Sequence, residues 1–356
     1  MTGDGERKGR ITLEDIARST GFSRATVSRV LNDKKSVKPS TVKIVEQAIE
    51  QLSYRPNVSA SALSGGRTMT VAVCLPETLR PYYSILLGGI ENISSQKGYD
   101  IIFKTKNYPR AARELAESRR VDGMIIRNMK EDAEHAQLFR ELVRCNIPFV
   151  LIGKPMQEYP SIHIDNVGGA RKVAHHFAEH GYRRILCITG PNRHVDAIDR
   201  VYGFKMGLSE RGIDPEGVTL AEGDYSKEQA FNLMKEHFPK PQFDAVFAAN
   251  DNMALGVLLY LRRIGMRVPE DMGLAGFDDS FFSEYLFPPL TTVRQPMYEM
   301  GSIAMETVVS LMEGSTREKG IILPTQLVVR RSCGCPYTYN GVDDADEGEH
   351  RHFDLV

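Results

Sequence analysis

From Met69 onward the chain alternates short apolar runs with amphipathic segments, and this alternation restricts its possible folds more than any other feature. Short strands that are apolar throughout belong to parallel sheets, because the helices that connect parallel strands bury both faces. The runs predict strands at Val71–Leu75, Asp100–Lys104, Gly123–Ile126, Phe149–Ile152, Ile185–Ile188, Ala245–Ala248 and Gly273–Gly276. The segments between and after them predict helices at Tyr82–Gln96, Ala111–Ser118, Ala133–Cys145, Gly168–His180, Asp199–Arg211, Lys227–His237, Asn252–Ile264 and Met297–Met312. The predicted fold class is an α/β body of doubly wound parallel sheets.

A chain of 356 residues is long enough for two or three domains. We expect the body, residues 69–337, to form two lobes that divide near Asp165–Gly169. The N-terminal lobe (N-lobe) comprises residues 69–166 and 297–325, and the C-terminal lobe (C-lobe) comprises residues 167–296 and 326–337. Open parallel sheets bind ligands beyond the carboxyl ends of their strands, so we expect a ligand site in the cleft between the lobes.

The segment Ile11–Asn32 carries the signals of two short helices joined by a tight turn. Thr12, followed three residues later by Asp15, is a helix-start pattern, and Gly21 permits a sharp turn after the first helix. Ser23 is expected to cap a second helix with a basic outer face. Such a pair can place the second helix in the major groove of DNA, and a solvated helical hairpin is the alternative. The outer face holds Arg24, Ala25, Ser28 and Arg29.

Three further segments flank these helices and the body. A third helix beginning at Pro39 completes an all-α head domain over residues 11–56. Residues 57–68 are rich in small side chains and can fold as a short hinge helix or remain an extended linker. The polar arm at residues 1–10 and the acidic tail at residues 338–356 bury little, and we expect both to be disordered.

The charge of the chain is divided between head and body. Residues 1–67 carry 12 Lys and Arg against 7 Asp and Glu, whereas the remaining residues carry 33 against 39. A basic head on an acidic body indicates that the head alone meets a polyanion.

The cysteines and the N-terminus predict a cytoplasmic protein. The five cysteines are an odd number, and three of them lie inside apolar runs, which favours buried thiols in a reducing compartment. The N-terminus has no apolar stretch of the kind that directs export, and no apolar run approaches the roughly 20 residues of a membrane span.

The order of these parts resembles the lactose-repressor/galactose-repressor family of bacterial transcription regulators, over roughly residues 12–333. The resemblance implies two periplasmic-binding-protein-like lobes and a dimer that binds pseudo-palindromic operator DNA, and leaves open whether dimers pair into tetramers. Each matching stretch is weak alone, but all occur in the family's order. They are TLEDIA, GFSRATVSRVLN, LSYRPN followed by ALSGGRT, VDGMII, AANDNMALG, GLAGFDD and PPLTTVRQP.

The resemblance also implies which residues contact DNA. Arg24, Ala25 and Arg29 occupy the principal base-reading positions, and Leu63 stands where the family inserts a leucine into the minor groove, with packing inside the linker as the alternative. Lys38 departs from the serine or threonine that often caps the third helix in the family, so a weaker cap is expected there. The implied DNA contacts are Thr12, Ser23, Arg24, Ala25, Thr26, Ser28, Arg29, Asn32, Tyr54, Asn57, Ala60 and Leu63.

For the body, the resemblance implies a set of effector contacts between the lobes. Carboxylate, amide and guanidinium groups around an aromatic floor suit a polyhydroxylated ligand, because each hydroxyl group both donates and accepts hydrogen bonds. A sugar or sugar derivative is therefore favoured. Alternatives remain at Asp278 (a strand-end cap), Asn250 (a helix cap) and Arg200 (a solvated helix face). The implied contacts are Tyr82, Tyr83, Arg127, Asp165, Arg200, Asn250 and Asp278.

Two patterns with metal-ligand spacing are weak in the sequence. His176 and His180, next to His175, form an i,i+4 pair, but no carboxylate or cysteine accompanies them as in a zinc-binding helix. Cys333 and Cys335 form a lone C-x-C with no second pair. We therefore predict neither a metal nor another cofactor.

Two other classes of protein compete with a regulator. An enzyme is disfavoured, because glycine-rich phosphate loops and the G-x-S-x-G nucleophile motif are absent. A periplasmic solute receptor shares the two-lobe body, but the basic head opposes it. The leading prediction is a sequence-specific transcription repressor controlled by a small ligand. The alternative is a cytoplasmic sugar-binding protein or a sugar-modifying enzyme without specific DNA recognition.

Overall fold

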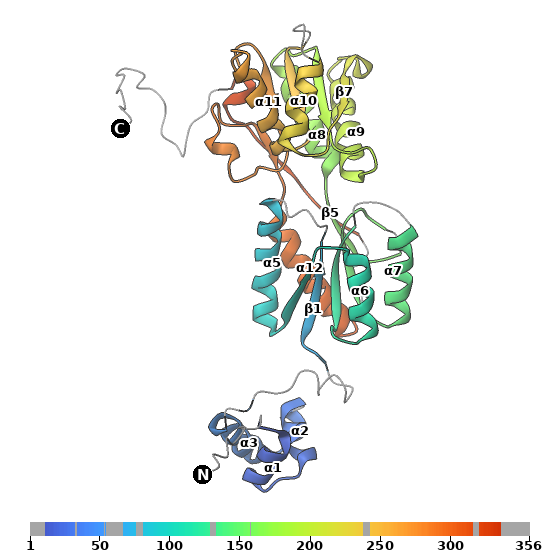
Figure 1. Ribbon diagram of the computed structural model, residues 1–356, viewed down its shortest axis with the longest axis vertical. Coiled ribbons are helices and arrows are strands. Elements are labelled where there is room, and N and C mark those ends of the chain that lie inside the picture. The colour runs from blue at the N-terminus through green and yellow to red at the C-terminus, as the bar shows by residue number, and fades with distance from the viewer. Residues whose placement is uncertain are drawn as a thin grey trace, which may run out of the picture.

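The computed structural model describes residues 11–32, 34–52, 54, 67–75, 81–128, 133–156, 158–237, 243–315 and 320–335, in a head and two lobes (Figure 1). The head contains α1 (Leu13–Thr20), α2 (Arg24–Asn32) and α3 (Pro39–Gln51). The helices of the body are α5 (Pro81–Lys97), α6 (Tyr108–Glu117), α7 (Ala133–Arg144), α8 (Asn166–Glu179), α9 (Val195–Glu210), α10 (Lys227–His237), α11 (Asp251–Arg263) and α12 (Met297–Met312). The predicted arm, most of the linker and the tail lie outside the described residues, as do Asn57, Ala60, Leu63 and the side chains of Asn32 and Tyr82.

The strands follow in chain order and belong to three sheets. They are β1 (Thr70–Cys74), β2 (Asp100–Lys104), β3 (Gly123–Asn128), β4 (Phe149–Gly153), β5 (Ser161–Ile164), β6 (Ile185–Thr189), β7 (Thr219–Glu222), β8 (Ala245–Ala248), β9 (Gly273–Ala275), β10 (Thr292–Arg294), β11 (Gly320–Leu323) and β12 (Gln326–Val328). All seven predicted strands are present, and the predicted helices are confirmed with ends that shift by a few residues.

The local signals of the head act as the sequence predicts. The backbone N–H of Thr12 donates to Asp15 Oδ2 at 2.9 Å, while the backbone N–H of Asp15 donates to the Thr12 hydroxyl at 3.4 Å. Gly21 ends α1 at φ 73°, and Ser23 caps α2 through the backbone N–H of Thr26 at 3.1 Å. Lys38 gives α3 no side-chain cap, as its departure from the family pattern predicts.

The six-stranded parallel sheet of the N-lobe has the order β11-β5-β4-β3-β1-β2. Alternate residues of β1 belong to different apolar clusters: Val71 and Val73 pack with residues of α5 and α12, whereas Ala72 and Cys74 pack with residues of α6 and α7. Because both sides of each strand need an apolar cover, the continuous apolar runs of the sequence follow directly from this arrangement.

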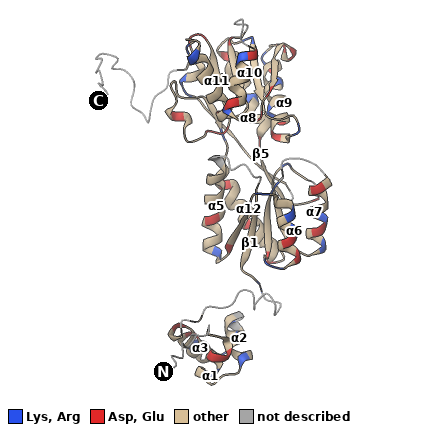
Figure 2. Cartoon of the chain, viewed as in Figure 1, with Lys and Arg blue, Asp and Glu red and all other residues tan. Residues whose placement is uncertain are grey.

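The C-lobe repeats the arrangement on a four-stranded parallel sheet of order β7-β6-β8-β9. Cys187 and Phe247 face α8 and α9, whereas Leu186 and Val246 face α10 and α11. Figure 2 shows both signs of charge on the outer helices of the two lobes.

The chain passes between the lobes three times. The first passage runs from β5 into α8, the second from β10 into α12, and the third from β11, which pairs with β5, to β12, which pairs with β10. Between these passages, Arg127 near the carboxyl end of β3 contacts Asp196 in the first turn of α9. Within the described part of the chain, no helix is both long and apolar enough to cross a bilayer.

Candidate functional site

The outer face of α2 carries the side chains that the sequence assigns to base reading. Arg24, Ala25 and Arg29 are exposed, while Val27 and Val30 on the opposite side are fully buried against α1 and α3. The first turn of α2 contains no acidic residue, so its N-terminal N–H groups present positive potential without a carboxylate to oppose a phosphate.

The other described members of the predicted DNA set divide into two groups. Thr12 and Ser23 are exposed at the N-terminal ends of α1 and α2, and Thr26 and Ser28 are partly exposed on α2. Tyr54 lies instead in the core of the head, with only 9% of its surface exposed. Its ring therefore packs the head together, which the sequence pattern alone did not indicate.

The lobes meet at a buried ion pair. Arg127, at the end of β3, donates through Nη1 to the carbonyl oxygen of Ile152 at 3.1 Å and through Nη2 to Asp196 Oδ2 at 2.5 Å. Asp196 lies in the first turn of α9, so this contact joins the N-lobe to the C-lobe. The opposite charges make this contact a charge-assisted hydrogen bond. Because both side chains are more than four-fifths buried, solvent screens it little.

A chain of polar contacts continues from Asp196 into the C-lobe. Asn166 donates through Nδ2 to Asp196 Oδ1 at 3.3 Å and accepts from Arg200 Nε at 2.8 Å. Arg200 is 4% exposed, so the solvated alternative for this residue is wrong. Its guanidinium lies 3.8 Å from the centre of the Phe277 ring and its Nη1 lies 3.7 Å from Asp278 Oδ1. Cations, carboxylates, an amide and an aromatic ring thus form one network of contacts at the junction of the lobes.

Asp278 of this network has an unusual backbone conformation, and Asp196 has a shifted pKa. Asp278 has φ 127°, a backbone conformation that L-residues rarely adopt, and its carboxylate accepts a hydrogen bond from the Gln295 amide. Burial raises the pKa of Asp196, but the nearby guanidinium groups of Arg127 and Arg200 outweigh it and lower the pKa below its ordinary value. Asp196 is therefore ionised at neutral pH.

His163 is a member of this site that sequence reasoning missed. It lies on β5, burial lowers its pKa, and both Asp196 and Asp165 act on it electrostatically. Its Nδ1 is buried without a hydrogen-bond partner among the described residues. An unsatisfied imidazole nitrogen at the junction of the lobes can bind a ligand hydroxyl group. A prediction of strand β5 would have placed His163 near the junction of the lobes, but the sequence analysis did not predict this strand.

The remaining predicted effector residues have structural roles in the described chain. Asn250 caps α11 through the backbone N–H of Met253 at 2.9 Å, and Asp165 caps α8 through the backbone N–H of Gly168 at 2.7 Å. Tyr83 is 2% exposed and belongs to the main apolar cluster. Arg127, Arg200 and Asp278 are the predicted residues that the structure brings into one network.

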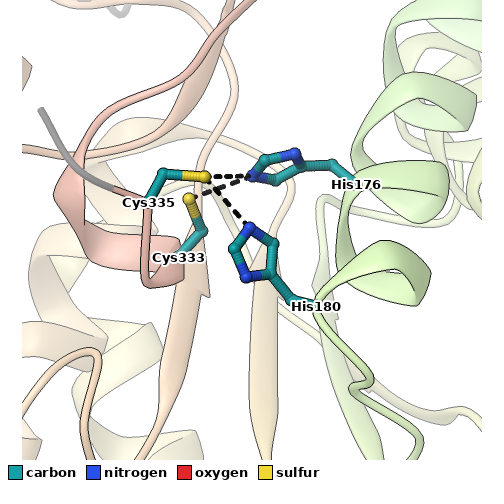
Figure 3. A group of neighbouring side chains, drawn as sticks. All are labelled: His176, His180, Cys333 and Cys335. Atoms are coloured by element: carbon teal, nitrogen blue, oxygen red, sulfur yellow. Dashed lines mark hydrogen bonds between the residues drawn. The ribbon is translucent and has the colours of Figure 1, made fainter.

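A second group of reactive side chains lies apart from this network. His176 and His180 of α8 face Cys333 and Cys335, and their four possible ligand atoms all lie within 4.8 Å of one another (Figure 3). The expectation that no cysteine accompanies these histidines was wrong. Residues separated by more than 150 positions meet here, because the third passage returns the chain to the C-lobe beside α8.

Sequence profiles of two domains match this chain. The profile described as bacterial regulatory proteins, lacI family, matches residues 12–57, and that of the periplasmic binding protein-like domain matches residues 174–333. The HTH-type transcriptional regulator CelR of Thermobifida fusca is 34% identical over 342 residues, which cover 92% of this chain and 99% of that protein. Catabolite control protein A of Priestia megaterium is 33% identical over 333 residues, 90% of this chain and 99% of that protein.

Solved structures agree with these relatives. The lac repressor dimer bound to operator and the anti-inducer ONPF has a TM-score of 0.80 and 27% identity, over 91% of this chain and 99% of that one. A complex of the transcriptional regulator CelR with cellobiose has a TM-score of 0.68 and 33% identity, over 91% of this chain and 100% of that one. This chain, with its exposed α2 face and two-lobed body, is thus a transcription regulator and not an enzyme. It belongs to the LacI family of bacterial regulatory proteins.

Proposed function

We propose that this regulator is a repressor that binds pseudo-palindromic operator DNA as a homodimer. The observation that carries the proposal is the exposed basic face of α2, whose opposite face is buried against the other helices of the head. Arginine pairs bidentately with guanine in the major groove, and Ala25 is small enough to contact a thymine methyl group. A two-fold operator would receive one such helix in each half-site.

The remaining DNA contacts of the proposal lie on or beside α2, in the linker and at the ends of the head. Thr12, Ser23, Thr26, Ser28, Asn32, Tyr54, Asn57 and Ala60 would contact the DNA backbone or flank the reading helix, and Leu63 would enter the minor groove between half-sites. Since its target is the chromosome, we place the protein in the cytoplasm.

The proposed effector is a sugar bound at the interlobe network. Arg127, Arg200 and Asp278, with Asn166 and His163 beside them, supply both donors and acceptors, as a ligand with many hydroxyl groups requires. The similar regulator CelR has been solved as a complex with cellobiose, which supports a sugar as the effector. Tyr82, Tyr83, Asp165 and Asn250 complete the proposed surroundings of the ligand, the last two through the helix starts that they cap.

Exposed apolar side chains on the body support the homodimer. Ile85 on α5 is 45% exposed and Tyr298 on α12 is 50% exposed, on two helices that pack side by side. The loop after β9 exposes Phe281 and Tyr285 to a greater extent. Burial of such residues against a second copy would remove apolar surface from water. Sedimentation of the full chain would measure whether it forms a dimer and whether dimers pair further into tetramers.

Selection of bound sequences from a random DNA pool tests the proposal. The full chain should enrich a palindromic motif, and one member of a panel of mono- and disaccharides should change that enrichment. The sign of the change distinguishes an effector that releases DNA from one that tightens the grip. Failure to enrich any motif under every condition would contradict specific DNA recognition.

Arg29→Ala should relax the preference at one base pair of each half-site. Loss of one bidentate contact should reduce discrimination there by about 1–3 kcal/mol while binding to random DNA changes less. Competition binding on single-substitution operators measures this change. Lys43→Ala on α3, another exposed cation, is the matched control and should leave the base preference intact. Equal losses on operator and random DNA would show that Arg29 contacts only phosphate.

A further inference from the structure

We propose that His176, His180, Cys333 and Cys335 form a structural zinc site that fastens the end of the described chain to α8. The His176 Nε2 atom lies 3.0 Å from Cys333 Sγ and 3.7 Å from Cys335 Sγ, and His180 Nε2 lies 3.0 Å from Cys335 Sγ (Figure 3). In a tetrahedral site with Zn–S near 2.3 Å and Zn–N near 2.0 Å, ligand atoms lie roughly 3.3–3.8 Å apart. Shifts of a few tenths of an ångström would therefore admit the ion.

Hydrogen bonds alone explain this cluster poorly. One imidazole nitrogen offers either one lone pair or one proton, yet His176 Nε2 faces two thiols, and Cys335 Sγ faces two imidazoles. The four groups thus converge on one point more closely than they pair with one another. A cation at that point would contact all four at once.

The chemistry of the four ligands favours zinc. Two thiolates and two imidazoles are the soft and borderline donors of tetrahedral zinc sites, whereas magnesium and calcium prefer oxygen. Binding would release the two thiol protons to solvent, and two thiolate charges would then balance the ion. A neutral complex suits this position, because Cys333 is completely buried and His176 is only 9% exposed.

The surrounding structure holds both ligand pairs in place. His176 and His180 are one helical turn apart on α8, and Gly334, at φ 92°, turns the backbone between the two cysteines. The hydroxyl group of Thr291 lies 3.0 Å from both Cys333 Sγ and the carbonyl oxygen of Arg330, so its proton could turn from that carbonyl to a thiolate at Cys333.

Metal content of the full chain tests the site. Protein purified under reducing conditions with zinc present should retain about one zinc per chain after dialysis, and cobalt should give the thiolate charge-transfer and visible bands of a tetrahedral site. Cys335→Ser and His180→Asn, at the partly exposed positions of the cluster, should lower zinc occupancy to less than about a tenth. Cys145→Ser and His175→Asn are the matched controls, since these residues lie outside the cluster, and both should retain wild-type occupancy.

A second measurement does not depend on variants. Because zinc would bind the folded chain only, a strong chelator should lower the melting temperature of the wild type and of both controls, and readdition of zinc should restore it. The two cluster variants should not respond to the chelator. Absence of bound zinc and of cobalt bands in reduced, folded wild-type protein would overturn the proposal. So would selective retention of copper, or a Cys333–Cys335 disulfide as the stable form.

Discussion

Asp251 is the most completely enclosed carboxyl group described at the edge of the interlobe network. It is fully buried, and its two oxygens accept hydrogen bonds from the hydroxyl groups of Thr292 and Ser283 and from the backbone N–H of Ser280. Burial raises its pKa to about 6 despite these bonds. Asp251 thus connects α11 to the loop that contains Asp278. Because ionisation of this buried carboxyl group is unfavourable, the free-energy cost of burying it grows with pH.

The pH dependence of Asp251→Asn follows from that shift. The folded chain binds the proton of Asp251 more tightly than the unfolded chain, so the stabilisation is present at low pH and is lost as pH rises through about 6. The free energy of unfolding of the wild type, relative to Asp251→Asn, should fall between pH 5 and pH 7.5 by about 1–2 kcal/mol.

Urea unfolding of the body at both pH values measures this difference. The exposed Asp100→Asn variant is the control for removal of a carboxylate and should show a much smaller change with pH. A difference between wild type and Asp251→Asn that stays constant, or that grows with pH, would mean that Asp251 remains ionised in its pocket.

Single residues show how far the sequence can define the site. The capping positions Thr12, Ser23 and Asn250 follow from local spacing alone, because a cap contacts N–H groups three residues away. Arg200 required the fold: its solvated alternative fails because α9 turns this side chain toward Phe277 and Ala249. No spacing rule links His163 of β5 to Asp196 of α9, so sequence reasoning could not find it.

At the scale of elements, α5 and α12 touch backbone to backbone at two glycines. A Cβ atom at Gly89 would lie 2.1 Å from the carbonyl oxygen of Tyr298, and one at Gly301 would lie 2.1 Å from that of Leu86. The close approach lets α12 reach the sheet, where Val308 and Met305 join the main apolar cluster. Neither helix could hold this position with an ordinary side chain at the contact.

Gly89→Ala should therefore destabilise the N-lobe. The methyl group would force α5 and α12 apart, at a cost of about 2–3 kcal/mol from the lost packing. Gly88→Ala is the matched control on the same helix: its Cβ would meet the Tyr298 ring at 3.9 Å, an ordinary contact. Because alanine has a higher helix propensity than glycine, Gly88→Ala should leave the stability unchanged or raise it by about 0.5–1 kcal/mol. Thermal unfolding measures both, and equal stability of the two variants would refute the close contact.

Several strands that the sequence failed to predict share a physical cause. Strands such as β5, β10 and β12 have only three or four residues and carry polar side chains. They hold their places through neighbours far along the chain: β5 pairs with β11, and β10 pairs with β12. The long apolar runs needed no such partner to be recognised. A large separation along the chain is also the reason why the sequence did not predict the contact of His176 and His180 with the C-terminal cysteines.

At the scale of the whole molecule, Arg127 and Asp196 connect two lobes that the chain itself joins at three passages. Any rotation of one lobe against the other must stretch or replace this ion pair. The free energy of the pair therefore enters any coupling between the proposed ligand and the head, because a ligand shifts the lobes only by its differential affinity for their different arrangements.

A double-mutant cycle on Arg127→Met and Asp196→Asn measures that contribution. Each single change removes the ion-pair contact of a nearly buried charge and should cost about 3 kcal/mol in free energy of unfolding. The double variant removes both charges, so its loss should be smaller than the sum of the single losses by about 1–3 kcal/mol. Lys205 and Glu216, an ion pair on the C-lobe surface, provide the control cycle, in which the coupling should stay below about 1 kcal/mol. Additive losses at Arg127 and Asp196 would instead mean that the three chain passages fix the lobes without help from the pair, and that a ligand could move the lobes without disturbing it.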